Sequence, residues 1–414
     1  MTSTPHTGLG SSLLFALLIS SVACSSDKTN PTPVAPAGGA SGVGGASGAA
    51  GNAGSGGANA GTSGLDAGAD AMASEPLGPC TPFAAVDVPM EKLSQTGCMD
   101  ATNKTQLAAL VIPYEVNSPL WSDSADKTRG MAVLPGKKIH VKDCAAEPDL
   151  CPVGDADTGN WVFPVGTVMV KNFMFDDKLL ETRLFEHPDD MTWVGYSYQW
   201  DEAQTDATIV PNERTPVMFN TGQRTIAWTY PSRDDCQVCH NAGGGPTLGP
   251  STHQMNRVVG GQNQIDKLSA LGMFDAPVPT PYQAALVTPY PGQLGSPPAG
   301  ATAEDKARSY LQANCAFCHR PDGPLPGMDM RFDVGLADMG VCDVTPTRGD
   351  EGVNNSLLIA HGQPSQSVIW LRMNAASDSG RMPPLASQVI DTAGVGVVGD
   401  WITSLTSCPV APDQ

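Results

Sequence analysis

Residues 161–173 read Trp161-Val162-Phe163-Pro164-Val165-Gly166-Thr167-Val168-Met169-Val170-Lys171-Asn172-Phe173. Apolar and β-branched residues on both sides of a Pro-Val-Gly centre are typical of two short strands joined by a turn. Three later runs, 180–184, 194–200 and 226–230, alternate with the period of two that a half-buried strand shows. We therefore expect an α+β protein in which residues 80–235 form a β-rich, antiparallel, sandwich-like domain.

The N-terminal segment has the pattern of an export signal. The apolar run at 13–19 is too short to span a bilayer and has the length of a signal-peptide core. The next residues, Ser21-Val22-Ala23-Cys24, resemble a bacterial lipobox, which implies a lipoprotein signal over residues 1–24 with lipid on Cys24. The alternative is an ordinary signal peptide cleaved after Ala23.

A linker follows this signal. Residues 31–75 contain 13 Gly and 13 Ala and no aromatic residue, so they have little to bury. The sequence predicts a disordered Gly/Ala-rich linker over residues 25–79, which would serve a lipid-tethered protein as a flexible spacer. We expect an exported protein, anchored by lipid alone at the outer membrane or cell surface, or else periplasmic.

Charge and hydropathy exclude two classes of function. The chain carries 42 acidic and 23 basic residues, for a net charge of −19, whereas a surface that binds nucleic acid must be basic. After the N-terminus, no run of 18 apolar residues exists, which excludes a multi-span membrane protein.

Two pentapeptides carry the chemistry. Both have the form C-x-x-C-H, the attachment signature of c-type haem: Cys236-Gln237-Val238-Cys239-His240 and Cys315-Ala316-Phe317-Cys318-His319. On a helical turn the three reactive residues share one face, so two thiols can bond the porphyrin edge while the imidazole reaches the iron. The sequence predicts two covalent haem c groups with His240 and His319 as axial ligands.

Other uses of these cysteines fit less well. Zinc sites made from two C-x-x-C pairs usually enclose about 15–20 residues, whereas 75 residues separate Cys239 from Cys315. A thioredoxin-like pair would follow a strand in a βαβ unit and would not repeat with a histidine each time. Purely structural cysteines remain the open alternative.

Six cysteines remain once Cys24 and the two motifs are set aside. In an oxidising compartment an even number suits three disulfides, although 15 connectivities are open. Pairing between sequence neighbours would join Cys80–Cys98, Cys144–Cys151 and Cys342–Cys408; free buried thiols are the alternative.

The second motif lies in a recognisable setting. Thr302 and Asp305 can cap a helix whose apolar stripe leads into Cys315, and residues 398–405 form a second stripe. Between them, Met382 precedes two prolines that hold it in a loop. This order resembles a class I cytochrome c over residues 302–408, which implies an all-α domain at 301–414 with Met382 as the distal ligand of the second haem. Arg372 and Arg381 are candidate partners of its propionates.

The first motif has a less complete setting. It follows a strand pattern, and only the segment 236–300 separates it from the next domain. Met255, Met273 and His253 are candidate sixth ligands, of which Met255 is the first choice. A five-coordinate iron stays equally open, since a methionine beside Val258 and Val259 is more often part of a core.

The chain also resembles a family of exported bacterial haem-binding proteins known mainly as conserved hypotheticals. The likeness covers residues 110–407 and lies in five segments: 114–123, 163–173, 181–184, 195–198 and 230–233 before the first haem motif. It implies haem c binding and electron transfer. A weaker resemblance, from Pro164 to Lys171, is to β-rich c-type cytochromes with a lysine-crosslinked haem, which oxidise hydroxylamine.

Three functions follow as hypotheses. The first is a dihaem cytochrome that exchanges electrons with a redox partner protein. The second is a haem-dependent oxidoreductase, acting on peroxide or a small nitrogen compound at a first haem with an open axial position. The third is a surface lipoprotein whose β-rich domain binds a partner.

Overall fold

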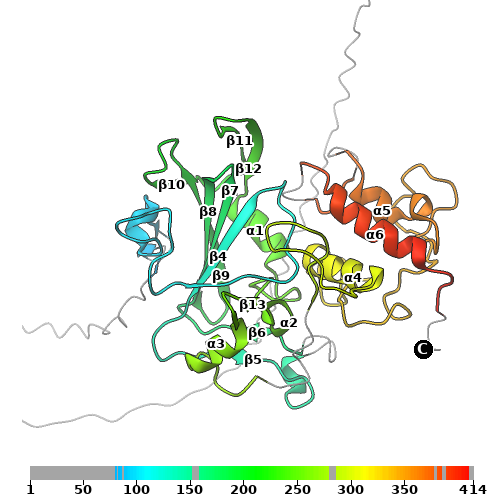
Figure 1. The fold of residues 1–414 in the computed structure, drawn as a ribbon, viewed down its shortest axis with the longest axis horizontal. Helices are drawn as coiled ribbons and strands as arrows, with labels where there is room; N and C mark the ends of the chain where they lie inside the picture. The colour runs from blue at the N-terminus through cyan, green and yellow to red at the C-terminus, as the bar shows by residue number, and fades with distance from the viewer. Residues whose placement is uncertain are drawn as a thin grey trace, which may run out of the picture. The chain divides into compact units, whose positions relative to one another are not determined.

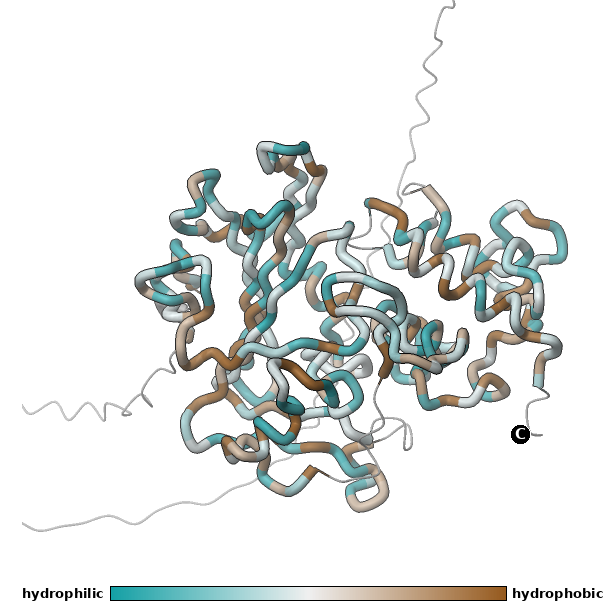
Figure 2. The backbone as a smooth tube through the Cα atoms, viewed as in Figure 1, coloured by the Kyte–Doolittle hydropathy of each residue, from teal (hydrophilic) through white to brown (hydrophobic). Residues whose placement is uncertain are grey.

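The computed structural model describes residues 80–81, 83–85, 88–151, 158–278, 286–376, 380–384 and 388–409. The expected signal peptide, Cys24 and the whole of the expected linker at 25–79 lie outside these residues. Figure 1 shows the long strands β4, β7, β8 and β9 side by side and the helices α4, α5 and α6 grouped in the later, yellow to red part of the chain. Figure 2 shows apolar and polar positions interspersed along these elements.

A six-stranded antiparallel sheet is the main β structure of the described residues. Its order is β10 (Ala207–Ile209), β9 (Thr192–Trp200), β8 (Lys178–Asp189), β7 (Val168–Phe175), β4 (Asp126–Ala132) and β3 (Ile112–Pro113). Four two-stranded sheets accompany it: β1 (Phe83–Ala85) with β2 (Val88–Pro89), β5 (His140–Val141) with β6 (Trp161–Val162), β11 (Thr215–Asn220) with β12 (Thr225–Tyr230), and β13 (Val258–Val259) with β14 (Gln262–Asn263).

The β-rich prediction is confirmed, with two differences of detail. The two strands expected within 161–173 do form, but β6 pairs with β5 while β7 pairs with β4 and β8. Gly166, at φ 88°, makes the turn between them. The large sheet has the short β11–β12 hairpin against part of one face instead of a second sheet of equal size. Trp228 and Tyr230 of β12 pack there with Phe173 and Phe175 of β7.

Both faces of the large sheet are covered. One face, which includes Val170, Leu184 and Tyr196, packs against the N-terminal segment that holds Leu93 and the Cys80–Cys98 disulfide. We call the opposite face the mixed face. It carries three rows of directly paired side chains across β4, β7, β8 and β9, listed in that strand order: Lys127–Phe173–Glu181–Gln199, Arg129–Lys171–Arg183–Ser197 and Met131–Met169–Phe185–Gly195.

Three short helices follow the β-rich region: α1 (Arg233–Cys239), α2 (Thr252–Met255) and α3 (Gln264–Ala270). The last two contribute apolar residues, among them Met255 and Leu268, to a cluster with Met131, Met169 and Phe185 of the mixed face. The mixed face is therefore packed at the row of Met131 by α2 and α3.

The later helices are α4 (Ala303–Asn314), α5 (Val368–Met373) and α6 (Thr392–Ser404). Thr302 caps α4 and exchanges hydrogen bonds with Asp305, as predicted. Tyr310 of α4 lies against Gly394 of α6 so closely that a Cβ at Gly394 would come within 2.4 Å of the ring. The two predicted stripes therefore share one buried cluster, in which Trp401 is fully enclosed.

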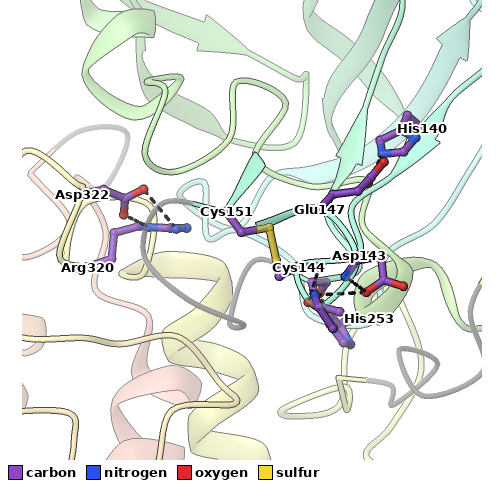
Figure 3. Close-up of a disulfide and its surroundings, with 11 residues drawn as sticks. His140, Asp143, Cys144, Glu147, Cys151, His253, Arg320 and Asp322 are labelled. Atoms are coloured by element: carbon purple, nitrogen blue, oxygen red, sulfur yellow. Dashed lines mark hydrogen bonds and ion pairs between the residues drawn. A yellow bond between two sulfur atoms is a disulfide. The ribbon is translucent and has the colours of Figure 1, made fainter. Parts of the chain in front are cut away.

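The 3-10 helices of the described residues are η1 (Leu93–Thr96), η2 (Pro148–Leu150) and η5 (Pro364–Gln366). Disulfides join Cys80 to Cys98, Cys144 to Cys151 and Cys342 to Cys408, the neighbour pairs considered from the sequence. Figure 3 shows the Cys144–Cys151 bond near His140 and Glu147. None of the helices in the described part of the chain is both long and apolar enough to cross a membrane.

Candidate functional site

The first C-x-x-C-H segment lies on helix α1 against the sheet. Ser232 caps the helix by accepting a hydrogen bond from the Asp235 N–H, and the helix carries Cys236 and Cys239 on its last turns. Gly195 of β9 leaves room for the first of these thiols, since a Cβ at that position would lie 2.9 Å from Cys236 Sγ. The glycine in the strand thus creates the space in which the thiol sits.

His240 ends this helix with one ring nitrogen already engaged. Its Nδ1 lies 2.5 Å from the carbonyl oxygen of Pro246, and its ring packs 4.1 Å from that of Phe185. Burial lowers the pKa of His240 to about 4, so the imidazole is neutral at physiological pH. A neutral ring that donates from Nδ1 to a carbonyl presents Nε2 as a metal ligand.

The second segment begins where helix α4 ends. Cys315 is the C-cap of α4, and burial raises the pKa of its thiol to about 12. The His319 N–H donates to the Cys315 carbonyl at 2.9 Å, which holds the histidine beside the thiol. Within the described residues, His319 Nδ1 is buried without a hydrogen-bond partner. A buried ring nitrogen of this kind costs free energy unless a metal or another group meets the ring.

The two segments contact each other. The thiols of Cys239 and Cys318 interact, Cys318 Sγ lies 3.9 Å from the Val238 carbonyl oxygen, and Asn241 Nδ2 donates to the Phe317 carbonyl at 3.3 Å. Gly244 closes the contact, because a Cβ there would lie 2.9 Å from the Phe317 carbonyl oxygen. The Gly-rich stretch after the first motif therefore serves as a flat surface for the second.

A cavity of about 340 Å³ opens beside this contact. Cys236, Cys239 and His240 all line it, together with Phe317 and Cys318 of the second motif. Its remaining wall includes the middle of the mixed face and the segment around Pro383 and Pro384.

The candidate sixth ligands of the first site lie elsewhere. Met255 is fully buried in the apolar cluster beneath the sheet, and Met273 packs against the same cluster. His253 Nε2 lies 3.0 Å from the Thr158 carbonyl oxygen. The cavity wall contains none of these three side chains but does contain Met169 of β7.

Met382 and the two arginines lie in the neighbourhood of the second motif. The Met382 N–H donates to the Arg372 carbonyl at 3.1 Å. Burial and then the charges of Arg372 and Arg348 lower the pKa of His319, so that histidine also lies near Arg372. Arg372 forms an ion pair with Glu351 at 2.7 Å, whereas Arg381 is buried and lines the cavity.

Sequence reasoning missed the cationic middle row of the mixed face. No local pattern in the sequence singles out Arg129, and Lys171 stands out only within the segment from Pro164 to Lys171. The signal is visible only once strand register is known, because three residues from three strands meet there.

Comparison with family models, with curated proteins and with solved structures finds no match for this chain. The chemistry of the site is therefore argued from its own donor groups. Paired thiols, a neutral imidazole with a free Nε2 and an adjacent cavity are the features that covalent haem requires. The residues of the first motif fit that group.

Proposed function

We propose that the protein is a dihaem c-type cytochrome that transfers electrons between the two C-x-x-C-H sites and a redox partner protein. The observation that carries the proposal is that Cys236, Cys239 and His240 line one cavity in direct contact with the second motif. In this proposal the protein is exported and held at the outer membrane or cell surface by lipid on Cys24, or is periplasmic.

Each residue of the first site has a defined task in this proposal. Cys236 and Cys239 form the two thioethers, and Gly195 leaves the space that the first of them needs. The Pro246 carbonyl holds Nδ1 of His240, which would leave Nε2 to bind iron when haem is attached. When bound, haem supplies reversible one-electron chemistry, and its potential responds to axial ligands and burial.

For residues 301–414 we propose a class I cytochrome c-like domain. The close crossing of α4 and α6, with Tyr310 against Gly394, supports this arrangement. Support for Met382 as the second axial ligand comes from its place before two prolines and from its backbone bond to Arg372, whose charge acts on His319. A thioether opposite an imidazole raises the reduction potential of such a centre and leaves no open position for a substrate.

The contact between the motifs suggests why two sites occur in one chain. Cys318 lies beside the Val238–Cys239 segment, so groups attached to Cys239 and Cys318 would lie side by side. Electrons could then pass within the chain without release to solvent.

A potentiometric titration of the mature protein tests this function. Electron transfer alone predicts two reversible one-electron steps and no spectral change when carbon monoxide is added to the reduced protein. Carbon monoxide binding at one centre would replace the proposal with the alternative of an oxidoreductase that has an open axial position.

A further inference from the structure

Three cations lie directly opposite one another in the middle row of the mixed face. Arg129 of β4 pairs with Lys171 of β7, which in turn pairs with Arg183 of β8. Like charges at directly opposed positions of neighbouring strands destabilise a sheet. A row of three therefore requires a compensating negative charge.

Within the described residues, Arg183 alone of the three is bonded directly to a carboxylate. Arg183 donates to both carboxylate oxygens of Glu181, at 2.8 and 3.0 Å. Arg129 is 7% exposed and makes no side-chain hydrogen bond or ion pair within the described ranges. Lys171 has only the ring of Phe173, 5.2 Å from its Nζ to the ring centre. The carboxylates that act on Arg129 and Lys171 are Glu115 and Glu181, and each is already ion-paired with another arginine, Arg257 and Arg183 respectively. Arg129 and Lys171 therefore have no carboxylate of their own, which is costly for a cation away from water.

These two side chains face the cavity beside the first motif. The row that contains Glu181 is covered by β12, whose Trp228 indole N–H donates to the Glu181 carboxylate at 2.9 Å. The row that contains Phe185 and Gly195 is covered by the first motif, because His240 packs on Phe185 and Cys236 packs on Gly195. The middle row is left between these two coverings, on the cavity wall.

The acidic side chains of the cavity wall are already engaged. Asp123 accepts a hydrogen bond from the Val389 N–H at 2.8 Å. Asp235 is paired with Arg214 and caps helix α1. Burial and the neighbouring cations lower the pKa of Lys171 well below its usual value, and an anion beside the ammonium group would oppose that shift.

We propose that Arg129 and Lys171 form an anion-binding site that takes a carboxylate or a small oxyanion next to His240. The anion has two possible sources. One is a propionate of the haem at the first motif, and this source rests on the proposed function. The other is a free anion such as nitrite or phosphate. In both cases the two cations make charge-assisted hydrogen bonds to anionic oxygen atoms.

The experiment uses the full mature chain, with Lys171→Met and Arg129→Met as test variants and Lys267→Met as the control, because Lys267 is exposed on α3. Each protein is titrated with sodium nitrite and with sodium phosphate by calorimetry, and its haem content is measured in the same sample. The pH dependence of the reduction potential is recorded for each sample that contains haem.

If the site takes a free anion, the wild-type protein should bind nitrite or phosphate. Either test variant should then weaken that binding by about 10- to 150-fold, and the control should not. A haem propionate predicts no binding of added anion by the wild type. Instead, loss of either cation raises the pKa of the propionate and moves the break in the potential–pH profile to higher pH. If neither effect occurs, the anion site is overturned. Failure of the anion site and failure of the proposed function are distinguished by the haem content. A sample without haem contradicts the proposed function, but it can still bind free anion.

Discussion

The thiol of Cys239 interacts with the thiol of Cys318, although the two residues are 79 positions apart in the chain. Cys318 Sγ lies 3.9 Å from the carbonyl oxygen of Val238, the residue before Cys239, and the interaction of the two thiols raises the pKa of Cys239 and lowers that of Cys318. Each is the second cysteine of its C-x-x-C-H segment. The two attachment motifs therefore form one site.

This contact predicts a disulfide when haem is absent. In protein made without haem attachment and exposed to a disulfide oxidant such as oxidised glutathione, the two thiols should lose two electrons and two protons, and the oxidant should be reduced to its thiols. Peptide mapping should then recover Cys239 linked to Cys318 and not Cys236 linked to Cys239. Recovery of four free motif thiols under these conditions would contradict the contact, and Cys239→Ser is the control that abolishes the crosslink.

Gly195→Val should prevent haem attachment at the first motif alone. Valine is favourable in a strand, but a Cβ at this position would lie 2.9 Å from Cys236 Sγ and would displace that thiol. The variant should retain one covalent haem, as measured by intact mass. Gly396→Ala is the control, because no atom lies within 4 Å of a Cβ built there. Full haem content in Gly195→Val would show that the thiol does not need this space.

Met382→Ala should lower the reduction potential of one centre by on the order of 100 mV, because axial ligands set haem potentials over about 0.8 V. Met255→Ala is the comparison. It should leave both potentials unchanged and lower the free energy of unfolding by about 2–5 kcal/mol, since it empties a fully buried position. Potentials that do not move in Met382→Ala would remove it as a ligand.

Stability should fall as the pH rises above the ordinary range of histidine. Burial acts to lower the pKa of His140, but hydrogen bonds to Asp275 and Glu147, each 2.8 Å long, outweigh burial and leave the pKa raised. The stabilisation is complete below about pH 6.5, the usual histidine value, and is lost as the pH passes the higher folded pKa. Figure 3 shows His140 beside Glu147. Thermal melts of the wild type should show a melting temperature that falls as the pH rises through this range. In His140→Gln, the part of this fall that comes from His140 should disappear.

Local patterns in the sequence predicted the elements of this fold well. Alternation identified the strands at 180–184, 194–200 and 226–230, and the Thr302–Asp305 pair identified the start of α4. Sequence proximity was enough to suggest the three disulfides. The strand and helix signals are local, because each depends on residues only a few positions apart, whereas the disulfides follow from pairing consecutive cysteines, which are 7 to 66 positions apart.

Features that depend on register and packing could not be predicted. Arg129, Lys171 and Arg183 are opposed only because three strands pair in one register. The contact between Cys239 and Cys318 joins segments with no common periodicity. The sequence also could not decide that Met255 is enclosed by the apolar cluster, since a methionine suits both a core and an iron.

The haem count of the mature wild-type protein tests the central claim most directly. Intact mass and the pyridine haemochrome spectrum, on protein made in a host that attaches c-type haem, should both give two covalent haems per chain. Cys236→Ser/Cys239→Ser and Cys315→Ser/Cys318→Ser should each retain one, whereas the control Cys144→Ser/Cys151→Ser should retain both. A wild-type chain whose mass contains no haem would contradict the account.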